Sequence, residues 1–215
     1  DCDALFIPDG GTEDEMIVKA KGIIHLLIET RGRAAHGSTP WKGENAIHKA
    51  LTLYKRIENI VHTGTREDYW HSTVNLGRLS GGDTINKVPD RAEIGIDIRF
   101  TEERTLDALL RAVTHAVGDE GVIVRAVHGN VFHTRNTTDP LLSSYRSILS
   151  EEFGRDITLG GEHGGSDARH FAHLPIPMWL HYPRGGEAHT NNEWVDITSL
   201  EKMYKGLVRF FRTTT

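Results

Sequence analysis

The residues of this sequence that could carry out chemistry lie in short glycine-rich stretches. The stretch "GGEAHTNNEWV", residues 185–195, holds His189 between two glycines and an apolar pair, with Glu193 four residues later. A neutral imidazole on such a loop is a common zinc ligand, although a loop histidine can also hydrogen-bond to nearby backbone. Asp9, in "FIPDGG", offers a carboxylate that either ligates zinc or forms an Asp-Gly turn. Since one histidine cannot hold a catalytic metal, a zinc site at His189 requires further ligands.

Two other stretches offer groups that bind anions. Arg99 in "DIRF" can present a bidentate guanidinium to a carboxylate, or it can pair with Asp97 or Glu93 on its own strand. The segment "GGSDA", Gly164–Ala168, presents backbone N–H groups where a helix is expected to start, which is either an anion site or a plain helix entry. Ser166 or Asp167 is the expected N-cap there, and we interpret Asp167 as a cap rather than a ligand.

Composition limits the classes of protein that the sequence fits. The 215 residues correspond to one or two domains, and a single domain of this size buries roughly 70% of its unfolded surface. The net charge of −5 and the dispersed Lys and Arg argue against nucleic acid as the main partner. No apolar run approaches a membrane span and no signal peptide is visible, so we predict a cytoplasmic protein without membrane contact. The single cysteine, Cys2, excludes an intrachain disulfide.

The elements that must position these residues follow a regular order in the middle of the chain. Residues 22–30 form a β-branched strand, 43–61 have helical apolar spacing, 72–82 and 92–100 alternate, 104–118 are again helical and 121–127 form a short strand. Thr101 or Thr105 is the expected cap of the second helix and Gly118 its end. The order β-α-β-β-α-β up to about residue 128 predicts a ferredoxin-like arrangement, with two helices on one face of the sheet and the other face open.

The remainder alternates strand and helix. A strand at residues 4–7, a helix from Pro140 to Gly154, a helix entered near Ser166, a strand at 176–183 and a final helix at 197–211, capped by Thr198 or Ser199, predict an α/β layer. We therefore expect residues 1–21 and 134–215 to belong together, with residues 22–133 as a separate ferredoxin-like domain.

Four motifs occur in an order that resembles a known family. The motifs are "GRAAHGSTPWKGENAI", "GGDTINKVPDRAEIGIDIRF", "GGSDARHF" and "GGEAHTNNEWV". They resemble the acetylornithine deacetylase / succinyl-diaminopimelate desuccinylase family, which includes aminoacylases, glutamate carboxypeptidases and small peptidases. The resemblance covers essentially the whole chain. It implies an α/β catalytic domain that binds two zinc ions (with cobalt or manganese as alternatives), interrupted by a ferredoxin-like lid through which two copies form a homodimer.

The resemblance assigns roles residue by residue. His189 matches the last metal ligand, and Asp9 matches an acidic ligand, where many relatives have Glu instead. His36 matches a lid histidine that donates to the substrate carbonyl oxygen, typically in the active site of the dimer partner; its alternative is a turn residue before Gly37. Asn86 and Arg99 match lid residues that hold the substrate, and Gly164, Gly165 and Ser166 match a substrate-binding loop. Glu193 is expected to orient the loop or His189 rather than to act as the base.

The implied reaction is hydrolysis of an amide bond in an N-acyl amino acid or small peptide with a free carboxylate. The alternatives are a di- or exopeptidase of the same family and a non-catalytic dimerisation or binding module. The family's first half of the catalytic domain, with the general base and several ligands, has no match in this sequence. We therefore expect this chain alone to be inactive, and we expect the missing half to be its partner, as another segment or a neighbouring chain.

Overall fold

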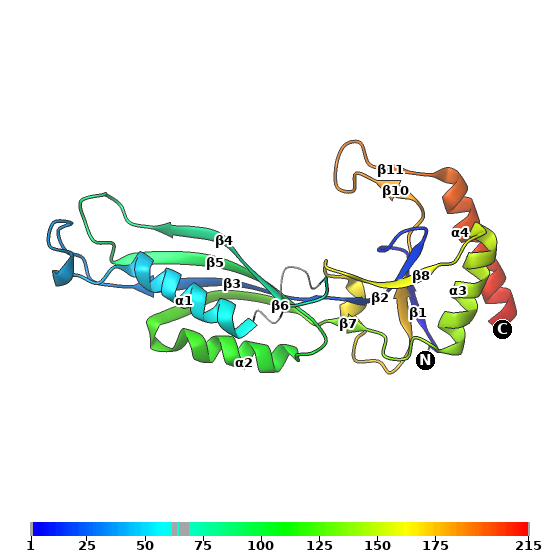
Figure 1. Ribbon diagram of the computed structural model, residues 1–215, viewed down its shortest axis with the longest axis horizontal. Helices are drawn as coiled ribbons and strands as arrows, with labels where there is room; N and C mark the ends of the chain where they lie inside the picture. The colour runs from blue at the N-terminus through cyan, green and yellow to red at the C-terminus, as the bar shows by residue number, and fades with distance from the viewer. Residues whose placement is uncertain (1, 62–63, 65–68, 215) are drawn as a thin grey trace. The chain divides into compact units, whose positions relative to one another are not determined.

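The computed structural model describes residues 2–61, 64 and 69–214, and it divides the chain into two compact units. Unit 1 contains the chain up to Lys21 and from Val131 onward, and unit 2 contains Gly22–Asn130. The colours in Figure 1 show the same division, because blue segments of the N-terminal region lie among the yellow to red segments of the C-terminal region. The α/β fold class expected from the sequence is confirmed.

Unit 2 has the element order expected from its sequence pattern. Its elements are β3 (Gly22–Arg31), α1 (Ala46–Val61), β4 (Thr73–Gly81), β5 (Arg91–Phe100), α2 (Leu106–Val117) and β6 (Gly121–Gly129), with two 3₁₀ turns, Pro40–Lys42 and Gly118–Glu120. The sheet is antiparallel in the order β4-β5-β3-β6. This is the ferredoxin-like arrangement.

Alternation along β5 explains how the sheet buries one face. Ile94, Ile96 and Ile98 are at most 3% exposed and share their layer with Leu53 of α1 and Leu109 of α2, which are also buried. The residues between the isoleucines are half-exposed and mostly charged, because successive side chains of a strand point to opposite faces. Of the two expected caps for α2, Thr105 is the one used, since its side chain accepts a hydrogen bond from the Ala108 N–H.

Unit 1 is a mixed sheet with helices packed against it. Its elements are β1 (Leu5–Ile7), β2 (Glu15–Ala20), β7 (Phe132–His133), α3 (Pro140–Phe153), β8 (Thr158–Glu162), β9 (Met178–Leu180), the pair β10 (Gly185–Gly186) and β11 (Trp194–Val195), and α4 (Ile197–Thr214). The five-stranded sheet runs β1-β9-β2-β7, with β8 beside β2. β1 is parallel to β9 and β2 is parallel to β8, whereas β2 is antiparallel to β9 and β7.

The structure corrects several details expected of unit 1. β2, β7 and β8 were not expected as strands, and β7 shifts residues 131–133 into unit 1 because it pairs with β2. The segment after Ser166 is a single 3₁₀ turn, Asp167–His170, rather than a longer helix. The cap of α4 is Asp196, whose carboxylate accepts from the Ser199 N–H at 2.7 Å, and not Thr198 or Ser199.

An aromatic core joins α3 and α4 to the sheet of unit 1. Tyr145, Trp179 and Phe210 pack with ring centroids 5.3–6.1 Å apart, and His181 lies 6.3 Å from Tyr145. His181 is fully buried, neither of its ring nitrogens has a hydrogen-bond partner among the described residues, and burial lowers its pKa to about 4. Among the described residues, no helix is long and apolar enough to cross a membrane.

Candidate active site

The carboxyl of Glu162 lies within the influence of two other carboxylates, Asp9 and Glu15. Asp9 follows β1, Glu15 begins β2 and Glu162 ends β8. The pKa of Glu162 is raised because its carboxyl is half-buried and because the charges of Asp9 and Glu15 repel its own. Gly10 packs against the same carboxylate, since a Cβ at this position would lie 2.7 Å from Glu162 Oε2. A cation in this place would relieve the repulsion.

The two metal ligands expected from the sequence suit zinc in kind but not in number. Carboxylate and imidazole are both zinc ligands, and Asp9 and His189 supply one of each. In the part of the chain that the structure describes, however, no three His, Cys, Asp or Glu side chains come together in a way that could hold a metal ion. The described residues therefore do not form a complete metal site.

The loop that carries His189 has an unusual backbone. His189 has φ 66° and Glu187 has φ 54°, and these are the two non-glycine residues with positive φ in the described part of the chain. Thr190 holds the loop, since its N–H and its hydroxyl both donate to the Glu187 carbonyl, at 3.1 and 2.8 Å. A non-glycine residue in the left-handed region costs about 1–3 kcal/mol and tends to occur at functional sites. His189 is also exposed, so its backbone conformation is a reason to test this residue for a role in the site.

The side chain of Glu193 does not touch His189. Its backbone N–H donates to the Thr190 carbonyl at 3.3 Å, but the described residues include no partner for its carboxylate. A part in shaping the loop therefore rests on the backbone of Glu193, and any orienting contact between its carboxylate and His189 remains a prediction.

Topology brings Asp9 and His189 into one unit. β1 and β9 are parallel, with Leu5 opposite Met178 and Ile7 opposite Leu180. The segments that follow the two strands, one leading to Asp9 and the other to the His189 loop, therefore leave the sheet at the same edge.

In unit 2, two loops bring His36 and Asn86 together. The Gly37 N–H donates to the Asn86 carbonyl at 2.7 Å, and the Val88 N–H donates to the Ala35 carbonyl at 2.8 Å. The Ser38 N–H also points at the His36 ring, with Nδ1 as acceptor at 3.2 Å, and the Ser38 hydroxyl lies 2.7 Å from the same atom. Because a backbone N–H can only donate, Nδ1 must be the acceptor, and in the neutral ring the proton is on Nε2. His36 is exposed, so this Nε2–H is available to an external acceptor.

Arg99 is paired within its own strand, which was one of the two expectations. Its Nε and Nη2 donate to the two oxygens of Asp97 at 2.9 and 3.3 Å, and His25 Nε2 lies 3.3 Å from the same carboxylate. Arg99 Nη1 has no acceptor among the described residues, so one edge of the guanidinium remains able to bind a ligand carboxylate.

The segment Gly164–Ser166 leads into the short 3₁₀ turn. Ser166 is buried and caps the turn, since its hydroxyl accepts from the Ala168 N–H at 3.2 Å. Asp167 is not the cap; its carboxylate lies 3.2 Å from Arg169 Nη1. One 3₁₀ turn has only a small dipole, which weakens the expectation that this segment binds an anion through a helix terminus.

Known proteins of similar sequence identify the family. The family model described as "Peptidase dimerisation domain" of the M20 peptidases matches residues 18–124. A probable carboxypeptidase from Aspergillus clavatus is 31% identical over 199 residues, which cover 86% of this chain and 46% of that protein. The chain belongs to the M20 family. A probable carboxypeptidase from Aspergillus fumigatus is 28% identical over 207 residues, which cover 91% of this chain and 45% of that protein. The family expected from the four motifs is thereby confirmed.

Solved structures of peptidases share the fold. The aminopeptidase PepT from Bacillus cereus superposes with a TM-score of 0.73 at 25% identity, covering 94% of this chain and 54% of that one. A tripeptidase from Staphylococcus aureus has a TM-score of 0.77 at 21% identity, with 98% and 56% covered. The chain spans about half the length of the curated M20 relatives it matches.

Glu162, whose pKa is raised by Asp9 and Glu15, was not predicted from the sequence as a site residue. Its signal was its place in "GGEHGG", one residue before His163 and between two glycine pairs. β8 brings that stretch alongside β2, which no local pattern predicted, so the proximity to Asp9 became visible only in the structure.

Proposed function

We propose that this chain takes part in the metal-dependent hydrolysis of an amide bond in a small substrate with a free carboxylate. A peptide is favoured over an N-acyl amino acid, because the similar proteins are called carboxypeptidase, aminopeptidase and tripeptidase. A non-catalytic role as a dimerisation or binding module is the alternative, favoured by the lack of a complete metal site among the described residues.

Asp9 and His189 are the metal ligands that this chain would supply. A bound zinc ion lowers the pKa of a coordinated water and polarises a carbonyl. The remaining ligands and the general base would correspond to the part of the relatives that has no counterpart in this chain, because the chain spans about half the length of those relatives. The chain alone is then inactive, and addition of zinc to it gives no turnover of dipeptides or N-acyl amino acids.

His36 would stabilise the negative charge that develops on the carbonyl oxygen. The Ser38 N–H keeps Nδ1 as an acceptor, so the exposed Nε2–H is the donor, without any change of tautomer. A donor of this kind is worth roughly 3–4 kcal/mol in acyl transfer. The hydrogen bond between Gly37 and Asn86 ties this histidine to the second proposed substrate-holding residue.

Substrate binding would use three groups. Arg99 would donate from its Nη1 edge to the substrate carboxylate while Asp97 accepts from the opposite edge. Asn86 would offer its amide, and the Gly164–Ser166 segment would offer backbone N–H groups. Unit 2 would also join two copies into a homodimer, which the description of the matching family domain supports.

The observation that carries the proposal is the strained backbone of His189, at φ 66° in an exposed loop. The test is zinc binding to the 215-residue chain, measured by isothermal titration calorimetry. His189→Gln is expected to weaken the tightest zinc site at least about tenfold, and Asp9→Asn is expected to do the same. His170→Gln is the matched control, because His170 is an exposed histidine of the same unit without an assigned role.

Equal zinc affinity in His189→Gln and His170→Gln would contradict the assignment of His189. Clear turnover by the chain alone would contradict the proposal that further ligands and the base lie elsewhere. A chain that binds zinc at neither Asp9 nor His189 but still forms a stable dimer would support the non-catalytic alternative.

A further inference from the structure

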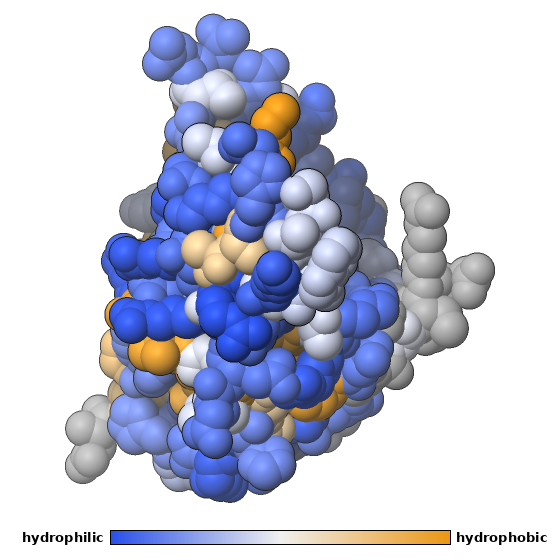
Figure 2. Space-filling model, turned by 90° about the vertical axis from the view of Figure 1, so that its left-hand side faces the viewer, coloured by the Kyte–Doolittle hydropathy of each residue, from blue (hydrophilic) through white to orange (hydrophobic). Residues whose placement is uncertain are grey.

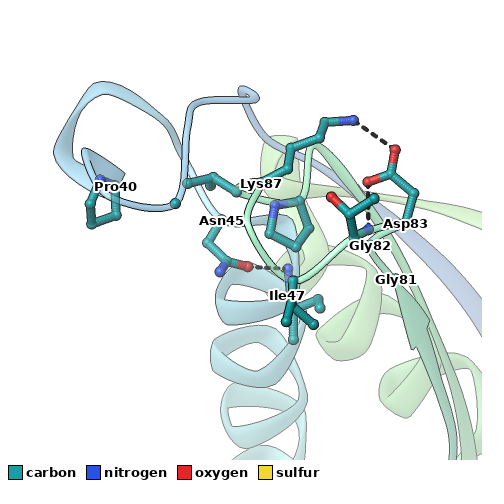
Figure 3. A pocket seen from close by; sticks show the side chains of 12 residues that line it. Pro40, Asn45, Ile47, Gly81, Gly82, Asp83 and Lys87 are labelled. Carbon is teal, nitrogen blue, oxygen red and sulfur yellow. Dashed lines mark hydrogen bonds and ion pairs between the residues drawn. The ribbon is translucent and has the colours of Figure 1, made fainter.

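Unit 2 contains a cavity of about 560 Å³ between the loop that follows β3 and the loop that joins β4 to β5. Figure 3 shows it from close by, with Pro40 and Asn45 on one side and Gly81, Gly82 and Asp83 on the other. Its volume falls within the range of about 300–1,000 Å³ that is typical of small-molecule sites. None of the roles assigned above uses this cavity.

Part of the wall is apolar. Ile47, Val88 and Pro89 line it together with Pro40, and the Gly81-Gly82 backbone forms a wall without side chains. Figure 2 looks at this end of unit 2, where hydrophilic side chains predominate and hydrophobic ones are few. The apolar side chains of the wall therefore belong to an end of unit 2 whose surface is mainly hydrophilic.

One polar group in the wall is unused. Asn45 Oδ1 accepts from the N–H groups of Ile47 and His48, at 2.9 and 3.2 Å, and so caps α1. Asn45 Nδ2 has no acceptor among the described residues, and in Figure 3 it points away from Ile47. The amide therefore offers donors to a carbonyl oxygen of a ligand.

The charged groups of the wall neutralise each other. Lys87 Nζ lies 3.1 Å from Asp83 Oδ2 and 3.3 Å from Asp90 Oδ1. The Asp83 Oδ1 atom in turn accepts from the Thr84 N–H at 3.0 Å. A charged ligand group would therefore meet no free counter-charge in the wall, whereas an aliphatic group would bury apolar surface against Ile47, Val88 and Pro89.

The cavity adjoins the two residues proposed to act on the substrate. Gly37 lines it and follows His36, while Ile85 and Lys87 line it and flank Asn86. We propose that the cavity is the specificity pocket for an uncharged aliphatic side chain of the substrate, on the residue whose carbonyl group meets His36 and Asn86. This inference rests on the proposed function, and it adds the substrate class: leucine-like residues are accepted, and acidic and basic ones are disfavoured.

The test is ligand binding to the metal-free chain, followed by ¹H–¹⁵N NMR titration. The probes are Nα-acetyl-L-leucinamide, Nα-acetyl-L-lysinamide and the α-amide of Nα-acetyl-L-glutamate. The leucine probe is expected to shift the amide signals of Gly81, Gly82 and Ile47, and to bind at least about fivefold more tightly than the other two. Since no metal and no turnover are needed, failure here is distinguishable from failure of the proposed hydrolysis.

Substitutions locate the site. Thr84→Trp, at an exposed residue of the wall, is expected to fill the cavity and to weaken the leucine probe at least tenfold, whereas Thr52→Trp, at an exposed residue of α1 outside the cavity, leaves its affinity unchanged. Asp83→Asn is expected to strengthen the glutamate probe, because Lys87 then retains only Asp90. Equal binding of the three probes, shifts confined to other residues, or an unaffected Thr84→Trp variant would each overturn the proposal.

Discussion

Gly37→Ala should separate the two loops that hold His36 and Asn86. A Cβ on Gly37 would lie 3.0 Å from both the carbonyl carbon and the oxygen of Asn86, and 3.2 Å from its Cα. All three are backbone atoms, so a side-chain rotation cannot relieve the contact. The substitution must therefore push the backbone of one loop away from that of the other.

The magnitude follows from the size of this displacement. The neighbouring backbone must move by a few tenths of an ångström, and the hydrogen bond from the Gly37 N–H to the Asn86 carbonyl, now 2.7 Å, stays within the usual range after such a shift. The cost is therefore that of overpacking, about 2 kcal/mol. For a domain of this size each 1 kcal/mol lowers Tm by about 4–8 °C, so we expect Gly37→Ala to lower the Tm of unit 2 by roughly 8–16 °C.

Thermal unfolding followed by circular dichroism measures the loss, and NMR shifts of His36 and Asn86 report the loop separation. Gly77→Ala is the matched control, because a Cβ there would meet its nearest atom at 3.6 Å, an ordinary contact. We expect this control to be neutral or slightly stabilising. If Gly37→Ala melts at the same temperature as Gly77→Ala, the close approach of the two loops does not hold the site together.

Three further predictions concern individual side chains. The folded-state pKa of His181 is about 4, below its ordinary value of 6.5, so the stability it contributes is present above pH 6.5 and is lost as pH falls toward 4, by about 3 kcal/mol; urea unfolding at pH 7.5 and 5 should show about 2 kcal/mol of this loss, and His181→Phe should reduce it. Thr105→Ala should cost about 1 kcal/mol because it removes the cap of α2, whereas Thr114→Ala, at an exposed residue later in the same helix, should not; chemical unfolding distinguishes the two. The neutral ring of His36 should be the Nε2–H tautomer, and ¹⁵N NMR of the neutral ring showing a proton on Nδ1 would contradict the proposed donor.

Local patterns predicted the elements whose burial is periodic. The strict alternation of Ile94, Ile96 and Ile98 in β5 was visible in the sequence because each isoleucine enters the same buried layer. α3 was bounded correctly at both ends, since Pro140 starts it and Gly154, at φ 71°, ends it. β8 was not predicted, because "TLGGE" has little hydrophobic pattern and owes its strand conformation to pairing with β2.

Site residues could be predicted from the sequence only where they stand in a recognisable motif. The His189 and Asp9 stretches were visible as motifs, and their ligand roles remain predictions. The pairing of Arg99 with Asp97 was foreseen as one alternative, because residues two apart on a strand share a face. The effect of the Asp9 charge on the pKa of Glu162 was not predicted, because about 150 residues of chain separate the two and only the sheet brings them together.

The pairing of β2 with β7 bears on how this chain could be re-engineered. The chain passes between the units twice, after Lys21 and after Asn130. In unit 1 Ala20 lies opposite Phe132, and in unit 2 Ile23 lies opposite Gly129, so in each unit the two strands next to these passages are paired with each other. If the chain were cut at both crossings, the two new ends within each unit would lie about 5 Å apart on paired strands. Joining the two ends of a unit would need no new long-range contact. Unit 2 could be excised and circularised, and β2 and β7 joined by a tight turn, so that each unit can be produced as an independent module.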